Sequence, residues 1–215
     1  MECFTIAESD VIFMLYIVGI GPGSREYILP KAMGTLEASD LILGFARALE
    51  SISEVKTDII AVKELKDIIN IANENKDINV SVIASGDPGF YGISNYIRSK
   101  YEGPIEVIPG ISSFQYFMAK LNKSWQNSYL GSLHGREESF LEEVKSNKLS
   151  VWLTDKKNCP EALCRKLYEE DIKVKVYVGE NLSYEDEVIS SGDPEQLMNK
   201  AYSELSVVVI ENEIY

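Results

Sequence analysis

The chain has 215 residues, 45% of them hydrophobic and 26% charged, and its 34 acidic and 21 basic side chains give a formal net charge of −13 at pH 7. Its length suits one large domain or two small ones, and its composition is that of a soluble globular protein. Because nucleic-acid surfaces depend on basic residues and a membrane span needs about 20 consecutive apolar ones, which no run here approaches, we expect neither a nucleic-acid nor a membrane partner.

The rare residues cysteine and histidine limit the kinds of site that the chain can build. Cys3, Cys159 and Cys164 are odd in number and lack CxxC spacing, so we expect reduced thiols and a cytoplasmic location. A single histidine, His134, argues against a histidine-rich metal centre, and we expect no bound metal.

The first residues of the chain differ from the rest. Residues 1–13 carry acidic side chains and no lysine or arginine, which is unlike a secretory or transit signal. A second methionine, Met14, stands directly before the first expected strand. We therefore expect residues 1–14 to form an N-terminal extension outside the folded domains.

Short β-rich runs alternate with helical runs, which indicates an α/β fold with a largely parallel sheet. In the first half we expect strands at residues 15–20, 41–43, 80–84 and 105–108, and helices at residues 29–37, 63–73 and 93–100. Pro30 suits the first turn of its helix, and the helix at 63–73 has apolar residues at the spacing of one helix face.

At Pro109-Gly110 this pattern stops and then restarts. In the second half we expect strands at residues 128–130, 149–153, 174–178, 187–190 and 206–210, and helices at residues 112–121, 137–144, 160–169 and 194–202. The final strands suggest an antiparallel meander. The resulting prediction is two α/β domains, residues 15–111 and 112–215, after the extension 1–14.

Two glycine-rich turns follow expected strands. GIGPGS covers residues 19–24, and SGDPGFYG covers residues 85–92. Glycine turns expose backbone N–H and C=O groups, and open α/β sheets bind ligands at the carboxyl ends of their strands. In the first turn Ser24 stands where a dinucleotide fingerprint has its third glycine, and Pro22 removes a donor. A nicotinamide-dinucleotide site stays open as an alternative, whereas no P-loop motif is present.

Four segments in order resemble one family: VGIGPGS (residues 18–24), SGDPGFYG (85–92), IPGISS (108–113) and GENLSYEDE (179–187). The chain is similar to the tetrapyrrole methylases over nearly all of residues 15–210. The resemblance implies two α/β domains with S-adenosylmethionine bound between them, and a homodimer.

Within that family, SLHGR (residues 132–136) and GENLSYEDE resemble the members that methylate carbon C5 of a precorrin or cobalt-precorrin in cobalamin biosynthesis. In some organisms such a domain is fused to a decarboxylating domain that methylates C15. Because this chain ends at residue 215, we expect a separate partner protein to carry that second activity.

The resemblance also implies which residues bind the methyl donor. They are Pro22, Ser85, Gly86, Asp87, Phe90, Ser112, Ser113 and Thr154. Bare backbone carbonyls and one carboxylate suit the ammonium and sulfonium charges of the donor. Three of them also have a plainer interpretation: Asp87 as a turn-capping residue, and Ser112 or Ser113 as a helix N-cap.

His134 and Arg136 are the residues that we expect to face the acceptor. Arg136 can bind a substrate carboxylate at two points, or form only a surface ion pair. His134 can bind a carboxylate or move a proton as the catalytic residue, or be an ordinary hydrogen-bonded loop histidine. A polyanionic substrate gains no long-range attraction from an acidic protein, so the pocket must be locally basic.

Three other functions remain open from the sequence. The first is another member of the same family, acting on a different ring carbon or on diphthamide or ribosomal RNA precursors. The second is a nicotinamide-dependent oxidoreductase that uses the turn at residues 19–24. The third is a non-enzymatic subunit that binds a corrinoid for a separate methylase.

Overall fold

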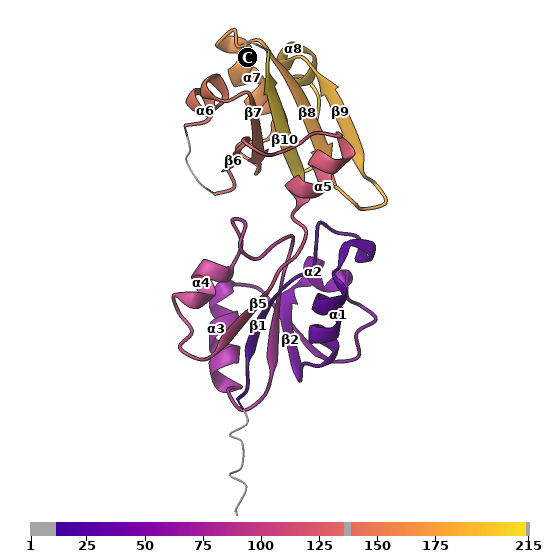
Figure 1. Ribbon diagram of the computed structural model, residues 1–215, viewed down its shortest axis with the longest axis vertical. Coiled ribbons are helices and arrows are strands. Elements are labelled where there is room, and N and C mark those ends of the chain that lie inside the picture. Colours follow the sequence, from indigo (N-terminus) through magenta and orange to yellow (C-terminus); the bar gives the residue numbers. More distant parts are fainter. Residues whose placement is uncertain (1–11, 136–138, 214–215) are drawn as a thin grey trace, which may run out of the picture.

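The computed structural model describes residues 12–135 and 139–213, and Figure 1 shows two α/β halves stacked along the long axis. The first half holds β1 (Leu15–Gly19), a 3-10 turn (Arg25–Tyr27), α1 (Pro30–Glu37), β2 (Leu41–Phe45), α2 (Ala46–Glu50), β3 (Asp58–Val62), α3 (Leu65–Glu74), β4 (Val80–Ala84), α4 (Ser94–Arg98) and β5 (Ile105–Ile108). The second half holds α5 (Ser113–Lys120), β6 (Tyr129–Ser132), α6 (Phe140–Ser146), β7 (Leu149–Leu153), α7 (Pro160–Glu169), β8 (Val174–Glu180), β9 (Val188–Gly192), α8 (Pro194–Leu197) and β10 (Ser206–Asn212).

The first sheet is parallel throughout, with strand order β3-β2-β4-β1-β5. Helices α3 and α4 cover one face, and α1 and α2 cover the other (Figure 1). All five residues of β4 are buried, as expected for a central strand covered on both faces. Because β1 and β4 are parallel neighbours, the glycine turns that follow them lie side by side at the carboxyl ends of the strands.

The second sheet is mixed, with strand order β6-β7-β10-β8-β9. Helices α6, α7 and α8 pack on one face, and α5 packs on the other. The expected meander was wrong, because β10 lies between β7 and β8 and is antiparallel to both. The apolar run Val207–Ile210 is buried on both faces of the sheet, which suits a central strand rather than the last strand of a meander.

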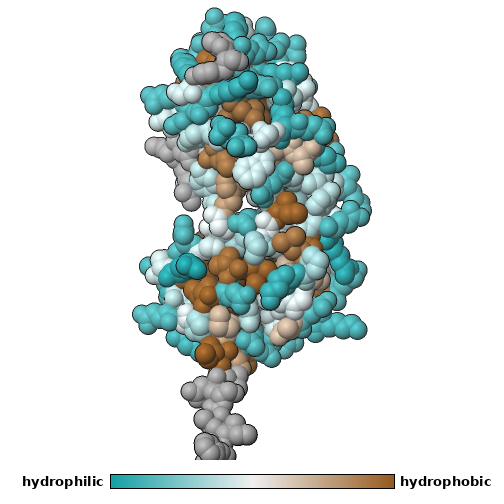
Figure 2. All heavy atoms as spheres, viewed as in Figure 1, coloured by the Kyte–Doolittle hydropathy of each residue, from teal (hydrophilic) through white to brown (hydrophobic). Residues whose placement is uncertain are grey.

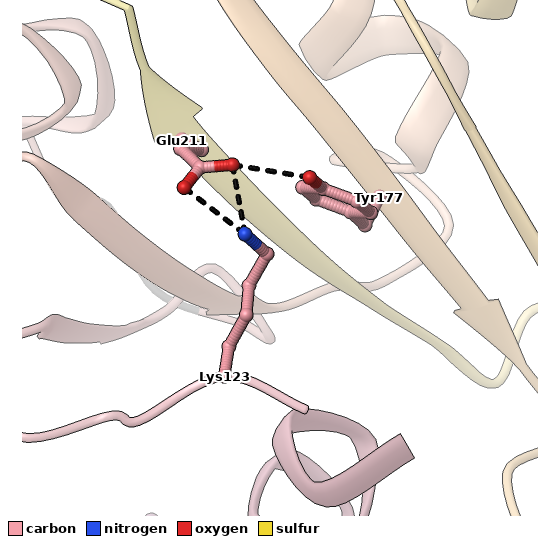
Figure 3. Close-up of polar contacts among 3 residues, drawn as sticks. All are labelled: Lys123, Tyr177 and Glu211. Atoms are coloured by element: carbon pink, nitrogen blue, oxygen red, sulfur yellow. Dashed lines mark hydrogen bonds and ion pairs between the residues drawn. The ribbon is translucent and has the colours of Figure 1, made fainter. Parts of the chain in front are cut away.

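A polar cluster fastens the chain after α5 to this second sheet (Figure 3). The Lys123 ammonium donates to both carboxylate oxygens of Glu211 at 3.0 and 2.9 Å, and the Tyr177 hydroxyl donates to the same carboxylate at 3.0 Å. Lys123 also lies over the Tyr177 ring at 5.0 Å. The cluster therefore fixes the chain to the second sheet just after it leaves α5.

Several element predictions need correction. The sequence pattern missed β3, an edge strand whose first four residues are exposed, and α2, which is only five residues long. The last helix ends at Leu197 instead of residue 202. Helix α6 begins at Phe140, while residues 136–138, where the predicted helix began, lie outside the described residues. Short or exposed elements lack the apolar periodicity on which such predictions depend.

Candidate functional site

Three glycine-containing turns meet at the carboxyl ends of the first sheet's strands, on the side that faces the second half. Gly86 and Gly21 exchange backbone hydrogen bonds, at 2.7 Å from the Gly86 N–H and 3.3 Å from the Gly21 N–H. A Cβ atom on Gly19 would lie 2.6 Å from the Gly110 nitrogen, and one on Gly110 would collide with the Gly86 carbonyl oxygen. Only glycine permits this close approach of three backbone segments.

Asp87 holds two of these turns together. Its Oδ1 accepts a hydrogen bond from the Gly89 N–H at 2.8 Å, and its Oδ2 accepts one from the Gly110 N–H at 3.1 Å. The turn-capping interpretation of Asp87 therefore describes its contacts in the structure. The half-buried carboxylate still places a negative charge beside the glycine turns.

Ser112 and Ser113 begin the helix that crosses to the second half. The Ser112 hydroxyl accepts a hydrogen bond from the Gln115 N–H at 3.4 Å, and the Ser112 N–H donates to the Gln115 side chain at 2.9 Å. This reciprocal pair is a capping box. A Cβ on Gly86 would lie within 3.9 Å of both serines, so the helix start borders the SGDPGFYG loop.

On one side of the junction, the first glycine turn packs against the segment GENLSYEDE. The Ser24 N–H donates to the Ser183 hydroxyl at 2.9 Å, and any side chain at Gly23 would collide with the Tyr184 ring. The Arg47 guanidinium lies over that ring, 5.2 Å from its centroid. These contacts hold the first glycine turn against the second half on this side of the junction. Pro22, which is half-buried, lies between Gly21 and Gly23, whose positions are constrained.

Glu187 anchors the same segment to α5. Its carboxylate accepts a hydrogen bond from the Ser183 N–H at 2.7 Å and pairs with Lys120 at 3.2 Å. Burial raises the pKa of Glu187, but hydrogen bonds from Tyr116, Ser183 and Lys120 together outweigh it and hold the pKa below its ordinary value. The segment is therefore tied down by an ionised carboxylate near neutral pH.

On the other side, the SGDPGFYG loop itself reaches the second half. The Tyr91 hydroxyl donates to the Leu130 carbonyl in β6 at 2.9 Å, and the Phe90 ring packs on Phe114 of α5 with centroids 4.5 Å apart. Tyr91 adopts a left-handed backbone conformation with φ of 51°, which is uncommon for a bulky residue. Figure 2 shows that the molecule is hollowed between its two halves.

His134 lies on an exposed loop after β6. Its Nδ1 is 3.1 Å from the Thr154 carbonyl oxygen, and because a carbonyl only accepts, Nδ1 carries the proton in this bond. In a neutral ring, Nε2 is then left as an acceptor. The Thr154 hydroxyl is buried and donates to the Ser206 carbonyl at 2.7 Å, so this side chain already has a structural partner.

Asp155 joins the His134 loop to the loop after β7. Its carboxylate accepts hydrogen bonds from the backbone N–H groups of Gly135 at 2.9 Å, Lys157 at 2.9 Å and Asn158 at 2.7 Å. The Gly135 bond, followed by the Asn158 bond, lowers the pKa of Asp155 below its ordinary value. Asp155 therefore helps to fix the backbone on which His134 stands.

The expected site residues fall into two groups. The glycine turns bring together Ser85, Gly86, Asp87, Phe90, Ser112 and Ser113 from the loops around β4 and α5. Thr154 and His134 form the second group on the loops of the second sheet, and Arg136 lies outside the described residues.

Sequence reasoning missed four residues at the junction. Tyr91 lies within SGDPGFYG, and Ser183 and Tyr184 lie within GENLSYEDE. Asp155 directly follows Thr154. Their side chains join loops that are far apart in the chain. The motifs marked the correct segments, but the contacts depend on tertiary structure.

Metal-binding clusters and membrane-spanning helices are both absent from the described part of the chain. Within residues 12–135 and 139–213, no three His, Cys, Asp or Glu side chains are grouped so that they could hold a metal ion. Over the same ranges, no helix has both the length and the apolar character required to cross a bilayer.

One parallel and one mixed sheet, each covered by helices and joined where glycine turns meet, define the α/β class of this protein. Residues 14–197 match the family model for tetrapyrrole (corrin/porphyrin) methylases. The chain belongs to this family.

Two relatives and one solved structure match over almost their whole length. A probable cobalt-precorrin-7 C(5)-methyltransferase of Methanocaldococcus jannaschii is 38% identical, with 93% of this chain and 99% of the relative covered. A cobalt-precorrin-7 C(5)-methyltransferase of Salmonella typhimurium is 29% identical, with 92% and 99% covered. The crystal structure of a precorrin-6Y methylase from Archaeoglobus fulgidus superimposes with a TM-score of 0.76 at 26% identity, covering 93% of this chain and 98% of that one.

Proposed function

We propose that this protein is an S-adenosylmethionine-dependent methyltransferase that methylates carbon C5 of cobalt-precorrin-7 in cobalamin biosynthesis. The observation that carries the proposal is the 38% identity, over nearly the full length of both chains, to a relative that bears this name. The meeting of the glycine-rich turns between the two halves supports it independently, because it brings backbone segments together without side-chain bulk, as a backbone-lined ligand site requires.

The residues at the junction fit the methyl donor. The glycine turns around Gly86 bring backbone close to a ligand without side-chain bulk, and Asp87 adds a carboxylate suited to a cationic group. Ser85 is exposed directly beside them. When bound, S-adenosylmethionine would supply an electrophilic methyl group on a sulfonium centre. The chain's contribution is to orient the reactants, which can lower a barrier by several kcal/mol.

We assign the residues that act on the methyl acceptor to the second half of the chain. His134 is exposed, and its Nδ1 is committed to the Thr154 carbonyl, so we assign Nε2 as the base that removes a proton from the macrocycle. Asp155 is a positioning residue, because it holds the His134 loop through the Gly135 N–H. Methylation of a ring carbon that carries hydrogen requires a proton to leave, and a fixed acceptor at this site meets that need.

The substrate's carboxylates require basic partners in an acidic protein. Arg25 pairs with Glu54 and Lys120 pairs with Glu187, so these cations are already partly neutralised. Arg47 lies over Tyr184 at the junction and forms no ion pair among the described residues. We propose Arg47 and Arg136 as carboxylate-binding residues. They would make the pocket locally basic, as a polyanionic substrate requires in an acidic protein.

A cytoplasmic location fits the same proposal. Cys159 and Cys164 are free thiols in the described structure, and burial raises the pKa of Cys164 to about 12, so this thiol stays protonated and unreactive.

Calorimetry separates the methyltransferase from an oxidoreductase. The proposal predicts that S-adenosylhomocysteine binds and that NAD does not, whereas NAD binding without S-adenosylhomocysteine binding would contradict it. Asp87→Ala should weaken S-adenosylhomocysteine binding because the loop loses its tie to Gly110. Arg47→Ala is the matched comparison and should leave the affinity for this ligand unchanged. Methyl transfer to cobalt-precorrin-7 then distinguishes an enzyme from a subunit that only binds a corrinoid.

A further inference from the structure

Four aromatic rings form a continuous row that crosses from the first half of the molecule to the second. In the SGDPGFYG loop, the ring centroids of Tyr91 and Phe90 lie 5.0 Å apart. Phe90 in turn lies 4.5 Å from Phe114 of α5, and Phe114 lies 5.4 Å from Trp125 in the loop between α5 and β6. We call these four side chains the aromatic row. Phe114 is buried within it, whereas Trp125 at its end is 43% exposed.

The exposure of Trp125 differs from that of an isolated surface residue. Single apolar side chains are common on protein surfaces, but an exposed ring that continues a packed aromatic cluster beside a candidate site is typical of a ligand-binding surface. The rings of Trp125 and Phe114 meet at 90°, so this contact covers at most one face of the indole. Trp152, the other tryptophan of the chain, is fully buried. Trp125 is therefore the tryptophan whose ring can stack on a bound molecule.

The backbone on both sides of Trp125 is fixed. Its carbonyl accepts a hydrogen bond from the Ser128 N–H at 3.1 Å, and this closes a turn in which Asn127 is left-handed with φ of 65°. Asparagine adopts that conformation more readily than most residues. Two positions before the tryptophan, Lys123 is bound to both carboxylate oxygens of Glu211. Because the loop is already ordered, little conformational entropy is lost when a ligand binds to it.

The segment that carries Trp125 contributes no negative charge. Residues 107–136 contain no aspartate or glutamate, although 34 of the 215 residues of the chain are acidic. The same stretch holds the basic residues Lys120, Lys123 and Arg136. Lys120 and Lys123 each pair with a glutamate of the second half, which neutralises those carboxylates. A ligand that carries carboxylates therefore meets no like charge from this stretch, in contrast to the chain as a whole.

We propose that the indole of Trp125 stacks on the macrocycle of the methyl acceptor and is a specificity-determining residue for it. The inference rests on the methyltransferase function proposed above. A precorrin has broad apolar ring faces and carboxylates around its rim, so it requires a flat aromatic surface without negative charge. Trp125 provides the aromatic surface, and residues 107–136 provide the surroundings without carboxylates.

The place of Trp125 in the chain assigns it to the acceptor and not to the donor. The loop that holds Trp125 leads through β6 to His134, the proposed base. At its other end, the aromatic row reaches the SGDPGFYG loop, which we propose to bind the donor. Stacking on Trp125 restricts how the macrocycle can turn relative to these two loops, and orientation of this kind favours methyl transfer to one ring carbon.

Titration of Trp125 variants with cobalt-precorrin-7 tests the inference. Trp125→Leu removes the aromatic surface and should raise the Kd for the corrinoid about tenfold, with an unchanged thermal midpoint and unchanged S-adenosylhomocysteine affinity. Trp125→Phe keeps a smaller ring and should recover most of the lost affinity. Tyr168→Leu is the matched control, because Tyr168 is an exposed aromatic residue on α7, and it should bind both ligands as the wild type does. Unchanged corrinoid affinity in Trp125→Leu, or an equal loss of affinity for both ligands, overturns the inference.

Hydroxyl-radical footprinting of the wild-type chain, read by mass spectrometry, locates the contact. Bound cobalt-precorrin-7 should slow the oxidation of Trp125 several-fold and leave that of Tyr168 unchanged, whereas S-adenosylhomocysteine alone should protect neither. Protection of Trp125 by S-adenosylhomocysteine alone would assign it to the donor and overturn the inference.

The two proposals fail in different ways. A chain that methylates C5 while Trp125 stays unprotected contradicts the stacking alone. A chain that protects Trp125 but transfers no methyl group contradicts the enzymatic function and supports the stacking contact. No binding of cobalt-precorrin-7 at all contradicts both.

Discussion

The Tyr91 hydroxyl donates a 2.9 Å hydrogen bond to the backbone carbonyl of Leu130 and so connects the loop after β4 to the first strand of the second sheet. The chain holds Tyr91 in a left-handed conformation at this point, which costs about 1 kcal/mol or more for a residue other than glycine. Because the bond crosses the junction, it couples the position of the loop that we propose to bind the donor to that of β6, which leads to His134.

Tyr91→Phe should weaken that coupling without unfolding the protein. One hydrogen bond contributes about 0.5–1.5 kcal/mol net, so we expect the KM for either substrate to rise about two- to tenfold, with a smaller change in the thermal midpoint. Tyr168→Phe is the matched control, because Tyr168 is exposed on α7 away from the junction. Unchanged steady-state kinetics in Tyr91→Phe would show that the bond has no role in the site.

His134→Asn separates the two functions assigned to the imidazole. The asparagine amide can still donate to the Thr154 carbonyl, but it cannot accept a proton as Nε2 does. A positioned base contributes about 10²–10⁴-fold to a rate, so kcat should fall by that order while S-adenosylhomocysteine affinity stays constant. A wild-type kcat in this variant would show that His134 does not act as the base.

Gly110→Ala should damage the proposed donor site and the fold together. The added methyl group would collide with the Gly86 carbonyl, and overpacking of this kind costs about 1–3 kcal/mol. We expect a lower thermal midpoint and at least tenfold weaker S-adenosylhomocysteine binding. Gly34→Ala in α1 is the control, because a Cβ there meets nothing within 4 Å and should stabilise the helix by about 0.5–1 kcal/mol. Equal effects of the two substitutions would contradict the close approach of the turns.

The Lys123–Glu211 pair should make stability depend on pH at both extremes. Lys123, more than the other partners, lowers the pKa of Glu211 below its ordinary 4.5, so the stabilisation is present above pH 4.5 and is lost as pH falls through the lower folded value. The hydrogen bond with Glu211 raises the pKa of Lys123 above 10.5, so the stabilisation is also lost as pH rises through that higher value.

Lys123→Met tests this dependence by urea unfolding. After allowance for partial solvent screening, we expect a loss of about 1 kcal/mol at pH 7 that shrinks as the pH falls below 4. Lys175→Met is the control, because Lys175 lies over the same Tyr177 ring but is the weakest of the named groups that lower the Glu211 pKa, so its pH-dependent loss should be smaller. A difference from wild type that stays constant between pH 7 and pH 3 would exclude the linkage.

The sequence predicts best the elements that are buried or that begin at a proline. β7 and α7 begin and end where the pattern places them, because a buried apolar run and an N-terminal proline are local signals. β3 lacks such a signal, since an exposed edge has no buried face to impose alternation. At the site, the glycine motifs marked the turns that meet. The Tyr91–Leu130 and Ser24–Ser183 bonds span 39 and 159 residues, so no local spacing encodes them.

The position of a labelled methyl group in the product is the most direct test of methyl transfer to carbon C5. The purified chain is incubated with S-adenosylmethionine labelled with ¹³C at the methyl group and with cobalt-precorrin-7, and the product is examined by carbon NMR after removal of cobalt. We expect one new labelled methyl group, attached to C5. A label on another ring carbon, or binding of both ligands without any transfer, would contradict it.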